Sequence, residues 1–469
     1  MKQKMRHTFR YMMAAALSCA AMVSFAQDLR TGYFNDGYLY RHNLNPALAN
    51  DSSYFSIPAL GNVNVGMMGN FGYEELVRKN PLYPQESDKK MTSFLNPYLS
   101  NPLKGFASGE NKINGMAKMT VMSFGFKKWN GYNTVELNMR ATANVSAPYK
   151  LFQFATEAAN FNYSIGDIYG SVQAFGELSF GHSRQVDEKL RVGAKVKLLV
   201  GLADASVKME DVTADLSDAN QWKITANAES HVSMNGFKYL SKRKEYNINP
   251  GTYDHVSDVD AGGVGVSGFG AAIDAGAVYK VNDEFTISAA VQDLGAIMWS
   301  NDYFATNDSK TFVFDGFHDV SVDSSSPDKL DNKADSYTDQ LLDFANLRDK
   351  GDKGSRVTGI GATLSAGCEY VIPTFRMLKL GLLGTARLNG PYSWSEARLS
   401  GNIAPKKWFD GTLSLAVNNY TANFGFLANF HTRGFNFFLG MDSLLGKLSN
   451  EMIPLSSNGG VSFGFNVIL

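Results

Sequence analysis

The sequence predicts an all-β protein, a 14-stranded antiparallel transmembrane β-barrel with an N-terminal plug-like segment and long extracellular loops. Three observations predict this fold: an export signal at the N-terminus, strands that alternate strictly between apolar and polar side chains, and connections that alternate between short and long. We divide the chain into a signal peptide (residues 1–26), a hatch or plug segment (residues 27–53) and the barrel (residues 54–469).

Residues 1–26 have the pattern of a cleaved export signal. Four basic residues precede the mostly apolar stretch 11–23, and Ser24-Phe25-Ala26 forms a small-x-small cleavage site. Lipoprotein processing at Cys19 is the alternative, but it leaves a very short apolar core. Removal of the signal takes away four positive charges, which changes the formal net charge from −1 to −5. A charge this small argues against a nucleic-acid partner.

The barrel strands are predicted from side chains that alternate with a period of two. Between Thr134 and Ser146 every second residue is apolar over thirteen residues, which suits a tilted strand that crosses a membrane. The final residues, 461–469, place every large apolar side chain but one on a single face, as in a strand that closes a barrel. A water-soluble sandwich shows the same alternation, so the number, length and spacing of strands carry the prediction. The predicted strands are 54–68, 117–127, 132–146, 167–184, 189–203, 266–281, 284–299, 356–371, 376–387, 393–404, 409–419, 421–430, 434–443 and 460–469.

The connections between these strands alternate in length, as periplasmic turns and extracellular loops do. The strand-like stretch 222–232 would break this alternation, so we assign it to the loop 204–265. Aromatic residues flank four of the short turns and indicate a girdle at the membrane interface. These residues are Trp129 with Tyr132, Tyr279 with Phe285, Trp408 with Phe409, and Phe430 with Phe435.

The luminal face of the strands carries charges that we expect to pair across neighbouring strands. With turns centred near residues 187 and 374, and a loop centred near 391, the expected pairs are Glu177 with Lys197, Glu369 with Lys379, and Arg387 with Glu396. Opposite charges across a ladder contribute roughly 0.2–1 kcal/mol each. Such pairs either brace a narrow lumen or line a polar pore, and their mixed signs favour bracing.

No catalytic or cofactor-binding pattern stands out, so we expect a protein that is not an enzyme and has no cofactor. Of seven histidines only His182 falls within a predicted strand, and its parity faces lipid. The sequence lacks a Ser-His-Asp set, a zinc spacing and a phosphate-binding glycine loop. The loop 300–355 carries twelve Asp and no Glu but no calcium-loop pattern, so we predict no metal site.

Asn45-Pro46-Ala47 lies just ahead of the first predicted strand. This position resembles the N-terminal hatch of FadL-type barrels, a superfamily that also has fourteen strands. The stretch 291–295, Val-Gln-Asp-Leu-Gly, resembles a strand signature of the PorV-like branch. The whole mature chain is similar to an uncharacterised domain family of outer-membrane barrels from Gram-negative anaerobes. The stretches that carry this likeness are 28–50, 191–202, 403–410 and 430–448.

The resemblance implies a protein of the cell outer membrane with residues 27–53 folded into the lumen. Pro46 fixes φ and Asn45 bonds readily to its own backbone, which suits a bend within a plug; a plain periplasmic lead-in strand is the alternative. The resemblance implies uptake of small hydrophobic compounds or, as in the PorV-like branch, a platform that docks secreted or surface proteins without transport. The partners are then outer-membrane lipid and either a hydrophobic ligand or such a protein. FadL ligand-binding residues do not map onto this chain one by one.

Two apolar segments of the predicted extracellular loops are candidates for collecting hydrophobic ligands. The alternative is that these loops fold over one another and cap the barrel. The first segment holds Phe94, Leu95, Tyr98, Leu99, Leu103 and Phe106, and the second holds Leu151, Phe152, Phe154 and Ala158 at helical spacing.

Overall fold

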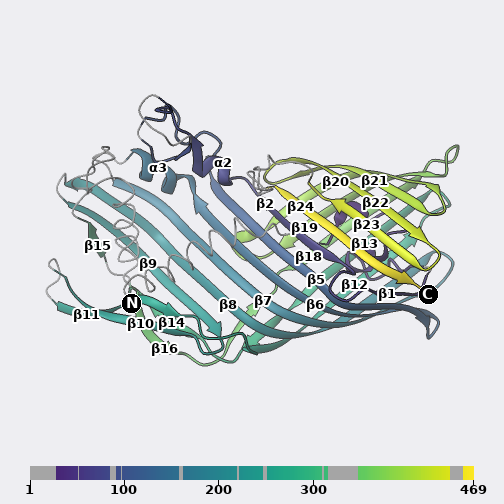
Figure 1. Ribbon diagram of the computed structural model, residues 1–469, viewed down its shortest axis with the longest axis horizontal. Helices are drawn as coiled ribbons and strands as arrows, with labels where there is room; N and C mark the ends of the chain where they lie inside the picture. Colours follow the sequence, from purple (N-terminus) through teal and green to yellow (C-terminus); the bar gives the residue numbers. More distant parts are fainter. Residues whose placement is uncertain are drawn as a thin grey trace.

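The strands close into one antiparallel barrel that carries long connections at one end and tight turns at the other (Figure 1). The computed structural model describes residues 28–50, 52–84, 91–96, 98–157, 162–218, 221–246, 251–308, 311–314, 347–443 and 458–469. The predicted signal peptide and Ala158 lie outside these described residues. We call the two ends of the barrel the loop end and the turn end; the C-terminus lies at the turn end.

The barrel closes through its first strand, which is divided into β1 (Tyr54–Ser56) and β2 (Val63–Gly69). Both parts pair with the last strand, β24 (Gly459–Ile468), on one side and with β5 (Glu110–Lys128) on the other. The remaining strands follow in chain order, and β17 and β18 together form a single strand of the barrel. They are β6 (Gly131–Pro148), β7 (Asn162–Gln185), β8 (Leu190–Asp218), β12 (Gly268–Lys280), β13 (Phe285–Trp299), β17 (Arg356–Gly359), β18 (Ala362–Val371), β19 (Leu378–Leu388), β20 (Trp394–Lys406), β21 (Phe409–Asn418), β22 (Ala422–Thr432) and β23 (Phe435–Met441). The prediction of a 14-stranded antiparallel barrel is confirmed.

The alternation along each strand separates an apolar outer face from a polar lumen. On β21, Leu413, Leu415 and Val417 point outward and are about 60% exposed, whereas Thr412 and Ser414 are almost fully buried. Exposed rows of apolar side chains are stable in contact with lipid, whereas their exposure to water would cost free energy. The outer face is therefore the lipid-facing surface.

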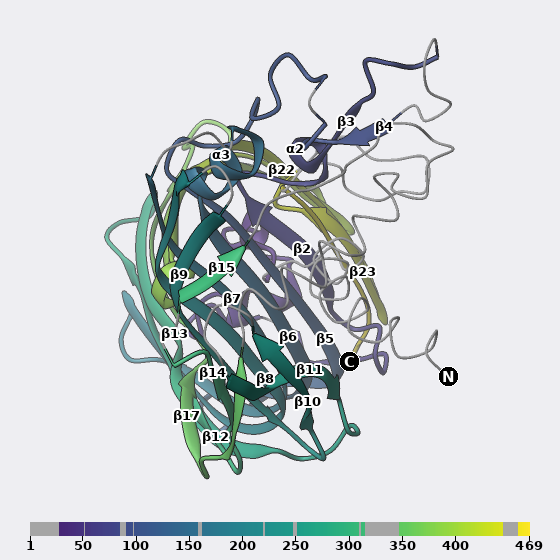
Figure 2. The same ribbon diagram turned by 90° about the vertical axis from the view of Figure 1, so that its left-hand side faces the viewer.

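One wall of the barrel is much taller than the other. β7 and β8 have 24 and 29 residues, whereas a membrane-crossing strand needs about 9–11. β12 pairs with β8 only as far as Gly201, and from Ala203 onward β9 (Gln221–Met234) pairs with β8 instead. β9 contains the stretch 222–232, which is not one of the fourteen barrel strands, as predicted, although it forms a strand that extends the same sheet. Figure 2, seen from the loop end, shows β9 and β15 on this wall.

Smaller elements gather at the loop end. β14 (Tyr303–Thr306) and β15 (Thr311–Phe314) pair with β9, and β16 (Arg348–Asp352) pairs with β14. The other elements are α2 (Tyr73–Leu76), β3 (Val77–Lys79), β4 (Met91–Ser93), α3 (Tyr149–Glu157), β10 (Lys238–Tyr246), β11 (Gly251–Asp260) and η3 (Gly390–Tyr392). Within the described ranges, no helix has the length and apolar character to cross a membrane.

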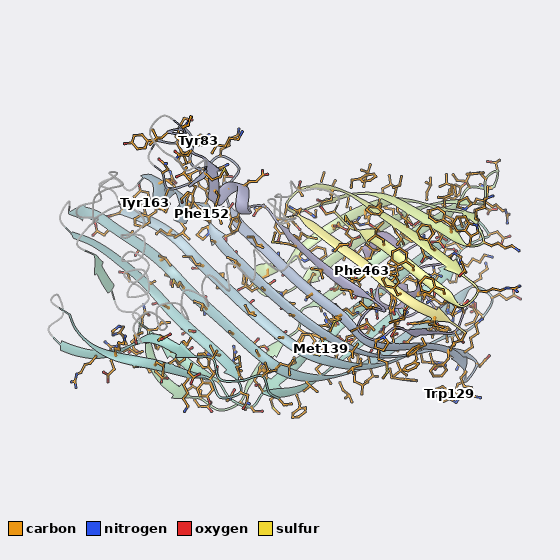
Figure 3. All side chains as sticks on the ribbon, in the orientation of Figure 1. Tyr83, Trp129, Met139, Phe152, Tyr163 and Phe463 are labelled. Carbon is orange, nitrogen blue, oxygen red and sulfur yellow. The ribbon has the colours of Figure 1, made fainter. Side chains whose placement is uncertain are left out.

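Aromatic side chains mark the turn end, as the girdle prediction requires, with one exception. Trp129 and Trp408 are more than half exposed, and Figure 3 shows Trp129 at the edge of the barrel. Tyr132 was predicted wrongly: it is 3% exposed and its hydroxyl donates to the carbonyl of Ser52 (2.9 Å). Its strand position points it into the lumen, where it meets the chain entering β1.

Replacement of Leu413 by arginine tests the lipid-facing assignment. Leu413 lies near the middle of β21 on the outer face, so Leu413→Arg places a charge in hydrocarbon and should destabilise the barrel by about 2–4 kcal/mol. The measurement is urea unfolding in phospholipid vesicles. Val417→Arg, on the same outer face near the end of the strand, is the control and should cost little. Equal stabilities of the two variants would contradict the assignment.

Candidate functional site

Residues 28–50 lie inside the barrel, and we call them the luminal segment. They contain two short 3-10 helices, η1 (Arg30–Gly32) and η2 (Leu39–Asn43), and most of their side chains are buried. In Figure 2 the purple ribbon of this segment is enclosed by the strands. Contacts with strands on several sides of the barrel hold it in place.

The luminal segment begins near the loop end of the barrel. The Asp28 carboxylate lies 3.0 Å from Lys118 Nζ on β5. Arg30 Nε lies 3.3 Å from Glu396 Oε1 and 3.3 Å from Asp442 Oδ2. The backbone N–H of Arg30 also donates to Asp442 Oδ2 at 3.0 Å. The start of the segment is thus fixed by charge-assisted contacts to two separate parts of the wall.

The segment then crosses the lumen and turns back. Asp36 pairs with Lys379 at the start of β19, near the turn end. At η2 the hydroxyl of Tyr40 donates to Asn466 Oδ1 on β24 (2.7 Å). Asn43 donates to Glu136 on β6 (3.3 Å). Because β6, β19 and β24 lie apart in the barrel, the segment spans its cross-section.

Aromatic rings fill the space around this crossing. Tyr38 packs edge-on against Phe438 of β23, with ring centroids 5.0 Å apart, and Tyr40 packs against Tyr54 of β1 at 5.7 Å. All four residues are fully buried. The hydrophobic core beside the luminal segment therefore lies within the barrel.

The predicted hatch residues Asn45, Pro46 and Ala47 form a buried turn against the wall. Asn45 Oδ1 accepts the N–H of Ala47 (2.9 Å), which closes the turn. Asn45 Nδ2 donates to Tyr33 OH (3.0 Å) and to backbone carbonyls of β12 and β13 (3.3–3.4 Å). This one amide both shapes the turn and attaches it to the barrel.

Two glycines allow the turn to approach the wall. Gly193 of β8 and Gly276 of β12 are cross-strand partners. A Cβ atom at Gly193 would overlap the backbone of Pro46, and one at Gly276 would overlap Asn45 Oδ1. Sequence reasoning missed both glycines, although each stands at a luminal position of a predicted strand.

A network of buried charges occupies the wall beside the luminal segment. Arg140 lies 2.8 Å from Glu177 and 2.8 Å from Asp293. Lys197 Nζ lies 2.8 Å from Asp274 Oδ2 and 2.6 Å from Asp293 Oδ1. Asp293 has a φ of +59° and stands where the register of β12 and β13 shifts, so a bulge turns its side chain into the lumen.

Glu177 and Lys197 are not the direct cross-strand partners that the sequence predicted. Gln185 pairs with Arg191, so the turn is centred at residue 188 rather than 187. When the centre of a turn moves by one residue, the cross-strand partner of each residue moves by two. The side chain then still points to the same face of the sheet but lies opposite a different residue. Leu199 therefore lies opposite Glu177.

The other two predicted pairs have different outcomes. Lys379 Nζ lies 3.3 Å from Glu369 Oε1, as expected, although Val371 is its direct cross-strand partner. The pair of Arg387 with Glu396 is wrong, because Glu396 lies opposite Thr385.

Free space in the lumen lies on either side of the luminal segment. A chamber of about 800 Å³ opens at the turn end, and its walls include Arg191, Lys406 and Lys407. Two cavities of about 50 Å³ each lie between the luminal segment and the wall, and Arg30 borders both.

Most of the predicted ligand-collecting residues pack against one another at the loop end. Phe106 and Phe152 are buried with ring centroids 4.3 Å apart, and Phe71 and Phe94 pack against them. Figure 3 shows Phe152 close to the mouth of the barrel. This arrangement corresponds to the alternative in which the loops cap the barrel.

The remaining loop residues differ in exposure. Leu95 and Tyr98 are each 51% exposed, and Leu99 is partly exposed. Leu103 is buried in the same cluster, and Leu151 packs against it. Phe154 contacts Tyr163 of β7, with ring centroids 5.7 Å apart.

The neighbouring helix α2 contains Glu75. Burial raises the pKa of the Glu75 carboxyl, and Glu75 Oε2 accepts the Gly72 N–H (2.7 Å).

The closed sheet, its bare apolar outer face and its polar lumen define the class of this protein, an outer-membrane β-barrel. The chain belongs to the family of unknown function DUF5723, which matches residues 46–442.

Comparison with curated proteins finds no match. Among solved structures, the toluene transporter TodX of Pseudomonas putida is 9% identical, with 96% of this chain and 94% of that chain covered and a TM-score of 0.39. A FadL homologue of Pseudomonas aeruginosa is 11% identical, with 95% and 98% covered and a TM-score of 0.39. The toluene transporter TbuX of Ralstonia pickettii is 9% identical, with 91% and 92% covered and a TM-score of 0.37. Likenesses at these TM-scores carry no argument, so the class rests on the barrel itself.

Neutralising Glu136 tests how firmly the lumen holds its N-terminal segment. Glu136 is fully buried, 2.8 Å from Lys195 Nζ and 3.3 Å from His42 Nε2. Glu136→Gln leaves Lys195 without its carboxylate, so we expect a loss of about 3–5 kcal/mol in unfolding free energy. Trypsin should also cleave faster after Arg41. Glu188→Gln, at an exposed turn, is the control, and equal behaviour of both variants would refute the expectation.

Proposed function

We propose that this protein is an outer-membrane channel for small hydrophobic compounds whose lumen is kept shut by the luminal segment. One observation carries the proposal: the segment crosses the barrel and is held by polar contacts, most of them buried, to strands on several sides. Asp28 and Arg30 hold it near the loop end, and Asp36 holds it near the turn end. A passage through the lumen requires this segment to move.

The contacts of the luminal segment suit an element that can be displaced as a unit. Its anchors are ion pairs and hydrogen bonds, which water can replace when the segment leaves the wall. Gly193 and Gly276 provide a defined seat for the turn around Pro46. The chamber of about 800 Å³ beneath the segment is open space on the turn side, into which a solute would be released.

Two features support a hydrophobic solute. Leu95 and Tyr98 stay exposed beside the aromatic cluster of Phe94, Phe106 and Phe152, and together they offer an apolar surface at the loop end. The resemblance of the segment around Pro46 to the hatch of FadL-type barrels points the same way.

Deletion of residues 28–50 tests the plug. In planar bilayers the wild-type barrel should conduct little, and the deletion variant should show large, steady currents. In cells, the wild type should raise the uptake of radiolabelled naphthalene but exclude sucrose, whereas the deletion variant should admit both.

The anchor variant Asp442→Asn should open intermittently, and Asp187→Asn, at an exposed turn, is its matched control. Equal conductance of the wild type and the deletion variant would contradict the plug. Naphthalene uptake no higher than in cells without the barrel would contradict the choice of solute.

The tall wall favours a second candidate, a platform that docks a secreted or surface protein, as the PorV-like resemblance implies. β7 and β8 rise far beyond the length that a membrane requires, and β9 extends the sheet beside them. Mild extraction from the native membrane distinguishes the candidates. A stoichiometric protein that is lost when residues 221–246 are removed supports the platform, and a barrel without such a protein favours the channel.

A further inference from the structure

Arg387 is a buried cation of the lumen that has no ion-pair partner among the residues that the structure describes; the Asp293 carboxylate acts on it only from a longer distance. Its side chain is 5% exposed. Within the described residues its guanidinium donates hydrogen bonds to the carbonyl of Ile360 (2.9 Å) and the hydroxyl of Thr363 (3.3 Å), and both acceptors are neutral. Across the part of the chain that the structure describes, no carboxylate lies within 4.0 Å of its guanidinium.

The expected partner, Glu396, is engaged elsewhere. Glu396 Oε1 lies 2.9 Å from Arg398 Nη2 and 3.3 Å from Arg30 Nε. Six other buried cations of the lumen each have a described carboxylate within 3.3 Å, which makes Arg387 the exception. These six are Arg30, Lys118, Arg140, Lys195, Lys197 and Arg398. An isolated buried charge is costly, so a counter-charge is expected at this place.

The wall is shaped to hold this guanidinium. The strand formed by β17 and β18 is interrupted at Ile360 and Gly361, which frees the Ile360 carbonyl to accept from Arg387 Nη2. Gly361 has a φ of +79°, and a Cβ atom there would lie 2.9 Å from the same nitrogen. A guanidinium carries five N–H groups, and these two hydrogen bonds use two of them. Donors therefore remain for a further acceptor.

The space beside Arg387 suits a small occupant. Arg387 borders both cavities of about 50 Å³, each with room for roughly three or four water-sized groups. Ser365 borders one of them, and its buried Oγ lies near the Tyr33 hydroxyl but has no hydrogen bond of normal geometry within the described chain. A guanidinium with a free hydroxyl close by matches the planar, two-oxygen shape of a carboxylate.

We propose that Arg387 and Ser365 form a binding site for a small monovalent carboxylate, of the size of formate or acetate, between the wall and the luminal segment. One unpaired positive charge calls for one negative charge, which disfavours sulfate or phosphate dianions. Arg30 and Tyr33 of the luminal segment border the same cavity, so the bound anion adds a contact at the seat of the segment. The site does not depend on what the barrel transports.

Thermal unfolding of the purified full-length barrel in detergent tests the site. The salt of the sample is changed from gluconate to formate at constant ionic strength and without chloride. Gluconate serves as the reference because its anion is too large for the cavity. The wild-type Tm should rise by a few degrees and saturate, because a ligand that binds only the folded state stabilises it by mass action. Arg387→Gln should lose this rise, and its Tm in gluconate should equal or exceed that of the wild type, because an unpaired buried charge has been removed.

Two further variants complete the test. Lys407→Gln removes an exposed cation at the turn end and should keep the full response to formate. Arg387→Lys retains the charge and should keep part of the response, which preserves the test if the glutamine variant does not fold. A wild type that ignores formate, or an Arg387→Gln variant that responds equally, would overturn the proposal. A stronger response to chloride than to formate would overturn the carboxylate assignment.

Discussion

The alternation of each strand between lipid and lumen is the constraint on which the rest of the structure depends. It exposes apolar rows such as Leu413, Leu415 and Val417 on the outside and turns the polar side chains between them into a narrow enclosed space. Buried polar groups must find partners. The lumen of this barrel solves that problem by pairing charges across strands and by receiving part of the chain itself.

The luminal segment serves as the complement of the barrel wall. Its carboxylates and guanidinium meet luminal charges of opposite sign at Lys118, Glu396 and Lys379, while its tyrosines fill the space between them. A paired glycine seat at Gly193 and Gly276 lets its central turn reach the strand backbone. The ion pairs and hydrogen bonds that anchor the segment can be replaced by water when it leaves the wall, which is the physical basis of the proposed channel.

Two further features are the asymmetry of the wall and Arg387, a buried cation without an ion-pair partner among the described residues. The extension of β7 and β8 places ordered sheet well beyond the hydrocarbon layer, where it is free to contact other molecules. Arg387 stands where a strand is interrupted, so the wall itself provides both the carbonyl and the space that the guanidinium uses. Departures from the regular barrel thus coincide with the places where we propose function.

The sequence by itself determined the strands, their number, their outward faces and the turn and loop ends, because period-two alternation and connection length are local properties of the chain. It also indicated the turn at Asn45-Pro46-Ala47, because proline and asparagine restrict their own backbone. Only the tertiary structure decided which charges meet. A shift of one residue in the centre of a turn moves a cross-strand partner by two, so Glu177 pairs with Arg140, and Arg387 does not meet Glu396. Long-range contacts such as Arg30 with Asp442 depend on the closure of the barrel, which no local pattern records.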